Sequence, residues 1–319
     1  MTDLLDRKLL FVTGKGGVGK STIAASLALL AAQRGKRTLV GEIDAKGNLA
    51  DFYETGPTAF KEREVSPGLW AMSMNTEESL KEYLTLQLKI PFIARLGPLA
   101  RTFDFVANAA PGVKEILTVG KFLWEVREHH YDLVVVDSVA TGHITAQLAA
   151  PAAIQDLVHV GVVRDQTDWM LDILGDPKRT GVVIVSAPEE MPVNETLELA
   201  TRLREETVVD LAAVVANRVL PELFGRAEEE VFDRINDRRG GAAPADVLSA
   251  AVGGPVQQLL DGAQLAVTLR RTRAQHLTHL REGLPPGTPL LYVPYLFQRS
   301  HGARATSQVA AHLGEELGF

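Results

Sequence analysis

The sequence predicts a doubly wound α/β fold built on a mostly parallel sheet. Strand-like apolar runs occupy residues 8–13, 38–43, 131–137, 181–186, 211–215 and 290–293, and helical patterns separate them. The run at 131–137 is apolar on both faces, as in strands that helices cover on both sides. At 319 residues the chain is long enough to bury a large core. Any ligand is then expected beyond the carboxyl ends of the strands.

The first elements are a strand, a glycine-rich loop and a helix. Residues 8–13 form a short apolar run that glycines stop, and residues 20–34 repeat apolar side chains at helical spacing until Gly35. A second strand is predicted directly afterwards, at 38–43. This order is typical of a strand, helix, strand unit with a right-handed crossover.

A helical insertion is predicted at approximately residues 75–130, because this connection is too long for a single crossover. It opens with Asn75 and Glu78 at the spacing of a capping box, and leucines then recur every four positions. A second helical segment is expected at approximately residues 143–178, before the next strand. Both segments interrupt the α/β pattern without replacing it.

The rest of the chain continues the alternation, with a helical pattern at 196–206. Only residues 240–244 resemble a loop-like break, so we expect one elaborated domain over residues 1–319. Length alone also allows two small domains. Residues 256–280 predict a helix that carries three arginines, either as a solvated charged face or as a functional basic patch. These are Arg270, Arg271 and Arg273.

The composition, with 46% hydrophobic and 23% charged residues, is that of an ordinary globular protein. A net charge of -7 repels phosphate backbones, which argues against nucleic acid as a partner. The chain has no cysteine, which excludes disulfides, thiolate zinc sites, iron–sulfur clusters and arsenite-type thiol chemistry. Neither a signal peptide nor a membrane-length apolar run is present, so we expect a cytoplasmic protein without an integral membrane segment.

A phosphate-binding loop is predicted between the first strand and the first helix, where the sequence matches GxxxxGK(S/T). Its backbone N–H groups can surround an anion at the positive end of the helix. Lys20 adds charge near the β and γ phosphates, and the Ser21 hydroxyl can bind Mg²⁺. The predicted nucleotide-binding residues are Gly14, Gly16, Gly17, Val18, Gly19, Lys20, Ser21 and Thr22. A coincidental glycine-rich turn is the alternative.

A second lysine, Lys15, directly follows the first glycine of this loop, GKGGVGKST. The loop resembles that of the deviant Walker-A ATPases, P-loop NTPases whose extra lysine contacts the nucleotide of the opposite subunit. The resemblance implies a dimer with facing nucleotides and catalytic roles for Lys15 and Lys20. An exposed loop lysine without a catalytic role is the alternative.

Longer segments narrow the resemblance to one family. EIDAKGNLAD at 42–51 and DSVATGH at 137–143 each follow a predicted strand. They resemble the switch motifs of the arsenical-pump ATPases (ArsA) and of the related guided-entry ATPases for tail-anchored membrane proteins. Further similar segments follow in order: APGVKEILTVGKFL, DPKRT, APEEMPVNET and VANRVLP. The resemblance covers most of the chain and is typical of bacterial single-domain members found as paired paralogues.

The resemblance assigns roles to both switches. Asp44 is the candidate that orients the attacking water, and Asp137, with Gly142 in the same second switch, is the carboxylate that holds Mg²⁺ through a water. A carboxylate that ends a buried strand points toward the phosphate loop, although either aspartate could instead cap a turn. After Asp44, Ala-Lys-Gly replaces the family's Pro-Ala-His, which predicts slow turnover or a site completed by a second paralogue. His143 is expected to form hydrogen bonds and not to act as a catalyst.

Base recognition is predicted at two positions. Asn217 ends a strand where family members read adenine with an asparagine, and Leu220 stands where a guanine reader needs an aspartate. ATP is therefore favoured over GTP. Pro294 matches the family's second base-packing loop, and core packing is the alternative role for the aromatic residues that follow it at 295–297.

The expected function is a dimeric ATPase switch with ATP and Mg²⁺ as cofactors. We expect it to couple the nucleotide state to an unidentified protein partner or client, as a homodimer or as a heterodimer with a paralogue. One alternative is a weakly active, ATP-bound scaffold or regulatory subunit paired with an active paralogue. Another is a targeting factor for tail-anchored proteins, although five methionines are few for an adaptable apolar groove. The absence of thiols argues against an arsenite pump subunit.

Overall fold

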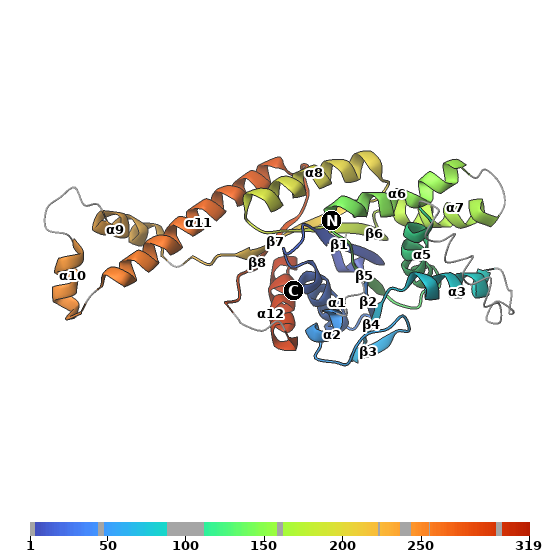
Figure 1. The fold of residues 1–319 in the computed structure, drawn as a ribbon, viewed down its shortest axis with the longest axis horizontal. Coiled ribbons are helices and arrows are strands. Elements are labelled where there is room, and N and C mark those ends of the chain that lie inside the picture. The colour runs from blue at the N-terminus through green and yellow to red at the C-terminus, as the bar shows by residue number, and fades with distance from the viewer. Residues whose placement is uncertain are drawn as a thin grey trace.

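The computed structural model describes residues 4–43, 48–87, 112–157, 162–222, 224–236, 244–254, 256–297 and 302–319. One sheet of eight strands runs through this part of the chain in the order β3-β4-β2-β5-β1-β6-β7-β8 (Figure 1). Every neighbouring pair is parallel except β3 and β4. Helices flank both faces, which confirms the predicted α/β fold of the P-loop type.

Six strands match the predicted apolar runs: β1 (Leu9–Gly14), β2 (Thr38–Glu42), β5 (Leu133–Asp137), β6 (Thr180–Ser186), β7 (Leu211–Val219) and β8 (Leu290–Pro294). Two further strands, β3 (Arg63–Ser66) and β4 (Leu69–Ser73), were not predicted. Strand β3 is short and its first two residues are exposed, because it pairs antiparallel at the edge of the sheet. An edge strand of this kind carries no apolar run in its sequence.

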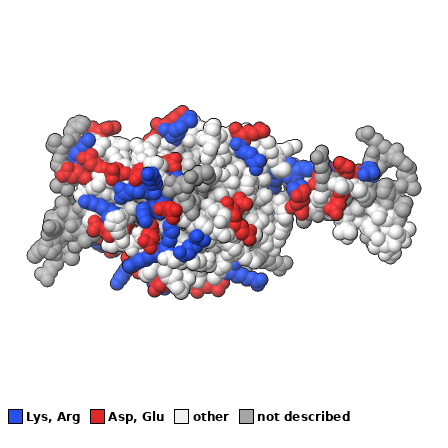
Figure 2. All heavy atoms as spheres, turned by 180° about the vertical axis from the view of Figure 1, so that it is seen from behind, with Lys and Arg blue, Asp and Glu red and all other residues white. Residues whose placement is uncertain are grey.

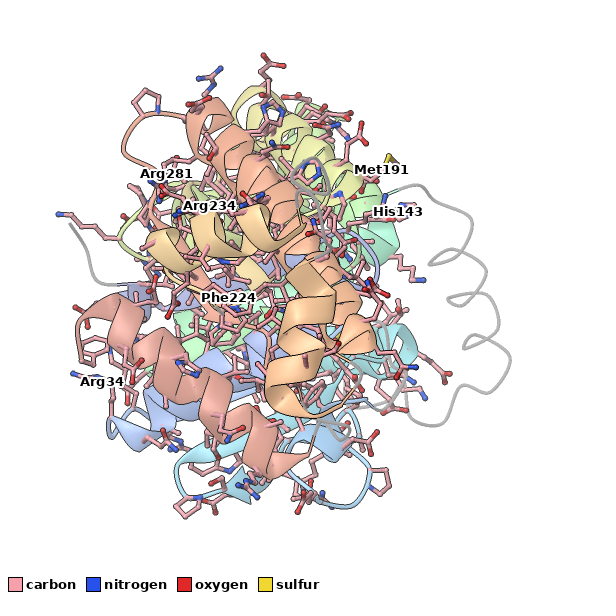
Figure 3. The ribbon with its side chains drawn as sticks, turned by 90° about the vertical axis from the view of Figure 1, so that its left-hand side faces the viewer. Arg34, His143, Met191, Phe224, Arg234 and Arg281 are labelled. Carbon is pink, nitrogen blue, oxygen red and sulfur yellow. The ribbon has the colours of Figure 1, made fainter. Side chains whose placement is uncertain are left out.

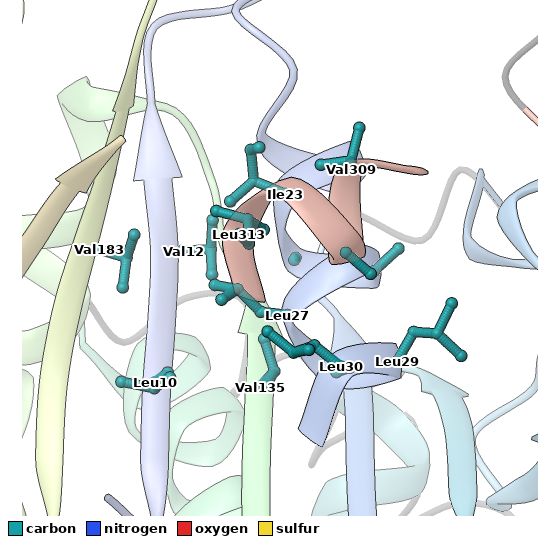
Figure 4. Packing of buried hydrophobic residues seen from close by; sticks show 14 of the residues in the cluster. Leu10, Val12, Ile23, Leu27, Leu29, Leu30, Val135, Val183, Val309 and Leu313 are labelled. Carbon is teal, nitrogen blue, oxygen red and sulfur yellow. The ribbon is translucent and has the colours of Figure 1, made fainter. Parts of the chain in front are cut away.

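The sheet separates two apolar cores. Alternate residues of β1 point to opposite faces, so Leu10 and Val12 enter one core while Leu9 and Phe11 enter the other. The first core also receives Leu27 of α1 (Lys20–Gln33), as Figure 4 shows. The helices on this face are α1, α2 (Asn48–Phe52) and α12 (Ala303–Leu317). On the other face lie α5 (Val113–Arg127), α6 (Thr141–Leu157), α7 (Val162–Gly175) and α8 (Glu190–Glu206).

The predicted insertion begins with a helix as expected. Helix α3 (Thr76–Gln87) is capped by Asn75, whose side-chain oxygen accepts a hydrogen bond of 3.0 Å from the backbone N–H of Glu78. Helix α5 ends the same insertion, and residues 88–111 between the two helices lie outside the described residues. The second predicted segment contains α6 and α7.

Helices α9 (Arg226–Asn236), α10 (Pro244–Val252) and the first half of α11 (Gln257–Gly283) form an arm that extends beyond the sheet (Figure 1). The arginines of α11 are paired within the chain: Arg270 with Glu222 and Glu229, Arg271 with Glu229 and Asp233, and Arg273 with Glu189. Acidic and basic side chains are accordingly interspersed where the arm leaves the body (Figure 2). These pairs favour the charged-face interpretation over a basic patch.

Among the described helices, none combines the length and the apolar character that a bilayer crossing requires.

Candidate nucleotide site

The phosphate loop joins the end of β1 to the start of α1, as predicted, and is held between two neighbouring strands. Gly14 has a φ of 149°, and a Cβ there would lie 2.2 Å from the backbone oxygen of Val185 on β6. Gly19 has a φ of 96°, and a Cβ there would lie 2.4 Å from Nδ2 of Asn217 on β7. Only glycine fits these two positions, because both the backbone conformation and the space exclude a side chain.

The middle of the loop is open, and its donors suit a polyphosphate. A Cβ at Gly16 or Gly17 would meet no heavy atom within 4 Å, and both residues are exposed. The loop leads into the positive end of the 14-residue helix α1. Lys20 begins that helix, and its Nζ lies 3.3 Å from the backbone oxygen of Lys15. Backbone N–H groups, a helix N-terminus and an ammonium group together fit an anion.

The second switch lies beside this loop. Asp137 ends β5, is 8% exposed, and pairs in register with Val12 of β1. The hydroxyl of Thr13 donates to the backbone oxygen of Val139 at 2.8 Å, which fixes the start of the switch against the loop strand. The Asp137 carboxylate and the Ser21 hydroxyl offer the oxygen ligands that Mg²⁺ prefers.

A buried glutamate that was not predicted as a site residue lies next to Asp137. Glu42 ends β2, is 1% exposed, and pairs in register with Asp137. Its Oε1 accepts a hydrogen bond of 2.5 Å from Ser73, which partly offsets the cost of burying the charge. Nearby, burial and the charge of Asp137 raise the pKa of the Tyr53 hydroxyl. A single acidic residue that closes an apolar strand was the available sequence signal.

Asp44, predicted to orient the attacking water, lies outside the described residues, which resume at Asn48. Its position relative to the phosphate loop therefore stays a prediction. Gly142 and His143 lie in the first turn of α6 and are both exposed.

Asn217 braces the phosphate loop, a contact that the sequence did not reveal. Its Nδ2 donates to the backbone oxygen of Val18 at 2.8 Å, and its Oδ1 accepts from the backbone N–H of Arg218 at 2.9 Å. Each contact uses one of the two donors and one of the two acceptor positions of the amide. The side chain that was predicted to read the base thus also holds the predicted phosphate-binding loop.

The aromatic residues after Pro294 are not part of the core. Pro294 pairs with Val219 at the end of β7, and the backbone N–H of Tyr295 donates to the Val219 oxygen. Tyr295 is 41% and Phe297 67% exposed, and their ring centroids lie 4.7 Å apart. Core packing therefore does not account for these two rings.

Lys15 forms an ion pair inside the chain. Its Nζ contacts Oε1 of Glu195 on α8, and the other carboxylate oxygen of Glu195 accepts a hydrogen bond of 3.2 Å from Thr141 at the start of α6. Figure 3 shows the starts of these helices on the same side of the molecule, marked by Met191 of α8 and His143 of α6. Glu195 lies in the segment APEEMPVNET, but no local pattern marks it, because its partners are distant in sequence.

Comparison with known proteins identifies the family. The model of the anion-transporting ATPase family matches residues 7–168 and 156–234. The chain is 30% identical to the ATPase BagA of Mycobacterium tuberculosis over 70% of each protein. It is 31% identical to a putative arsenical pump-driving ATPase of Halobacterium salinarum, over 73% of this chain and 40% of that protein. It is 32% identical to the ATPase get3 of Schizosaccharomyces japonicus, over 46% of this chain and 45% of that protein.

These similarities agree with the geometry of the loop between β1 and α1 and with the resemblance that the sequence motifs carry. The chain belongs to the anion-transporting ATPase family and is an ATPase.

Proposed function

We propose that this ATPase is a Mg²⁺-dependent dimeric switch that couples its nucleotide state to a protein partner or client. The observation that carries the proposal is the open phosphate loop with a lysine at each end, Lys15 and Lys20. Lys20 belongs to the subunit's own phosphate site, as in other P-loop proteins. Lys15 has no counterpart in the general motif, and the family resemblance gives it a role across a dimer.

Within each subunit we assign Mg²⁺ to Ser21 directly and to Asp137 through a water. The ion supplies charge neutralisation at the phosphates. Asp44 orients the water that attacks the terminal phosphate. The contacts of Asn217 to Val18 and Arg218 use one amide donor and one acceptor position. Asn217 reads adenine with the second donor and the second acceptor position. Pro294 packs against the base, as the family resemblance implies.

The second switch continues directly into α6, and α6 packs against α5, α7 and α8. A movement of Asp137 can therefore be transmitted through α6 to the helices that pack against it. This arrangement supports a protein partner, and the acidic net charge of -7 argues against nucleic acid.

Sedimentation velocity with a non-hydrolysable ATP analogue and Mg²⁺ tests the dimer. The analogue should shift the chain, alone or with a co-expressed paralogue, from monomer to dimer, because a nucleotide held by both subunits binds the dimer more tightly. Lys15→Ala should weaken this shift at least several-fold. An unaltered monomer in both settings would refute the proposal.

A weakly active scaffold is the second candidate, and the altered first switch favours it. Ala45, Lys46 and Gly47 replace the family's Pro-Ala-His and change both the stiffness and the charge next to Asp44. Single-turnover hydrolysis by the isolated chain separates the two candidates. The switch hydrolyses its bound ATP unaided, whereas the scaffold needs its paralogue.

A targeting factor for tail-anchored proteins is the third candidate, drawn from the guided-entry resemblance. Such a factor must cover a helix of about 20 apolar residues, roughly 30 Å long. Much of the apolar surface of α5 and α7 is already used, since Phe122, Leu123, Met170 and Leu174 are at most 4% exposed. We expect no stable complex with a tail-anchored test segment. A stoichiometric, ATP-dependent complex on co-purification would restore this function.

A further inference from the structure

We propose that Glu195 is a positioning residue that holds Lys15 inside its own subunit until the second switch moves. The inference rests on the proposed function, in which Lys15 acts on the nucleotide of the opposite subunit. It assigns a role to a carboxylate outside the phosphate loop and both switches.

The carboxylate of Glu195 joins three segments that are far apart in sequence. Its Oε1 pairs with Lys15 of the phosphate loop, and its Oε2 accepts from Thr141, which lies in the second switch. Glu195 itself lies on α8, which follows β6. The parallel sheet brings these segments together because each one leaves the carboxyl end of its strand.

The backbone of α8 is anchored on both sides of Glu195. The neighbours Val193 and Thr196 are 0% and 1% exposed, and Thr196 donates to the backbone oxygen of Pro192 at 2.8 Å. The side chains of Lys15 and Glu195 are 31% and 30% exposed, so solvent screens their attraction less than that of a fully exposed pair. Lys15 therefore pairs with a carboxylate that an anchored helix presents to it, and not with another side chain of its own loop.

The contact has an energetic consequence for assembly. While the ammonium group of Lys15 faces Glu195, its charge is neutralised within the subunit, and its attraction for a phosphate of the partner is reduced. Moving Thr141 away removes one of the two contacts of the carboxylate and lets Glu195 leave the lysine. The state of the second switch thereby sets how available Lys15 is to the opposite subunit.

Sedimentation of the full chain with the ATP analogue and Mg²⁺ tests this arrangement. Glu195→Gln keeps the shape and removes the charge, and should lower the dimer dissociation constant about three- to fivefold. Thr141→Val should shift it in the same direction by less. Glu198→Gln removes the same charge from an exposed position one turn further along α8 and should match the parent chain.

The lysine itself provides the decisive control. In a Lys15→Ala background, Glu195→Gln should have no further effect, because the group it restrains is absent. The inference is overturned if Glu195→Gln matches Glu198→Gln, or if it weakens the dimer as Lys15→Ala does. Failure of the parent chain to dimerise, or indifference of its dimer to Lys15→Ala, instead removes the proposed function on which the inference rests.

Discussion

Lys20 supplies the positive charge at the helix end of the phosphate loop. Lys20→Ala should abolish tight ATP binding, because it removes the charge nearest the β and γ phosphates. Isothermal titration calorimetry measures the loss directly. Lys178→Ala, which removes an exposed lysine from the turn before β6, is the matched control and should bind ATP normally. Equal affinities in the two variants would contradict the phosphate site.

Asp44 is expected to act in hydrolysis and not in binding. Asp44→Asn keeps the shape of the side chain but loses the charge that orients water, so ATP affinity should persist while turnover falls about a hundredfold or more. Single-turnover hydrolysis and calorimetry on the same preparation separate the two effects. Equal turnover in parent and variant would make Asp44 a turn residue.

Consecutive residues of a loop can be predicted from sequence alone. The phosphate loop is a continuous motif whose glycines are required by the local backbone, so Gly14 and Gly19 were readable without a structure. Glu195 contacts a lysine 180 positions away, and Asn217 contacts the loop across 199 positions. No local pattern encodes such pairings. They become visible only when the order of the strands is known.

At the scale of elements, buried parallel strands were predictable and edge strands were not. Strands β5 and β6 are buried along their whole length and mostly apolar, because helices cover both faces of the sheet. Strand β3 has exposed charged residues, so no run marks it. The helix at 256–280 was predicted, but its extension away from the sheet was not. The sequence of such a helix is equally compatible with packing on the sheet.

A charged cluster joins the insertion to the sheet. Lys121 of α5 is 5% exposed and lies within 3.1 Å of carboxylate oxygens of Glu62, Glu82 and Glu125. Burial acts to lower the pKa of Lys121, but its hydrogen bond to Glu125 and the three negative charges outweigh burial and raise it. Burial also raises the pKa of Glu82, against the opposing effect of Lys121.

Tyr131, beside this cluster, predicts a loss of stability at alkaline pH. Burial, with the charges of Glu62 and Glu125, raises its pKa from 10.0 to about 12. Between these values the folded chain holds a proton that the unfolded chain has lost, so the free energy of unfolding falls as pH rises through this interval. Tyr131→Phe should make that fall shallower.

Urea denaturation at several pH values between 9 and 12 measures the slope. Tyr295→Phe, at an exposed ring, is the control and should keep the slope of the parent chain. The pKa of Lys121 is also raised, from 10.5, so Lys121 adds to the fall in the upper part of this interval. That contribution is common to both variants and does not alter their comparison. An identical slope in both variants would argue against the Tyr131 contribution.

At the scale of the whole molecule, the chain has no cysteine and so offers no thiolate ligand to arsenite or antimonite. Arsenite or antimonite should leave its ATPase rate unchanged, because trivalent arsenic requires thiolate ligands that histidine and carboxylates replace poorly. Steady-state hydrolysis with and without the metalloid tests this expectation. Stimulation would reveal a site made of other ligands.

The long helix α11 has the proportions of a lever. Its base is fixed on α8: Leu280 is fully buried, and a Cβ at Gly283 would lie 2.7 Å from Leu197. Its 27 residues span roughly 40 Å, so a rotation of about 10° at the base displaces the far end by roughly 7 Å. Helix α8 also carries Glu195, which faces the phosphate loop. A tilt of α8 too small to break its own packing would therefore be magnified at the tip of the arm.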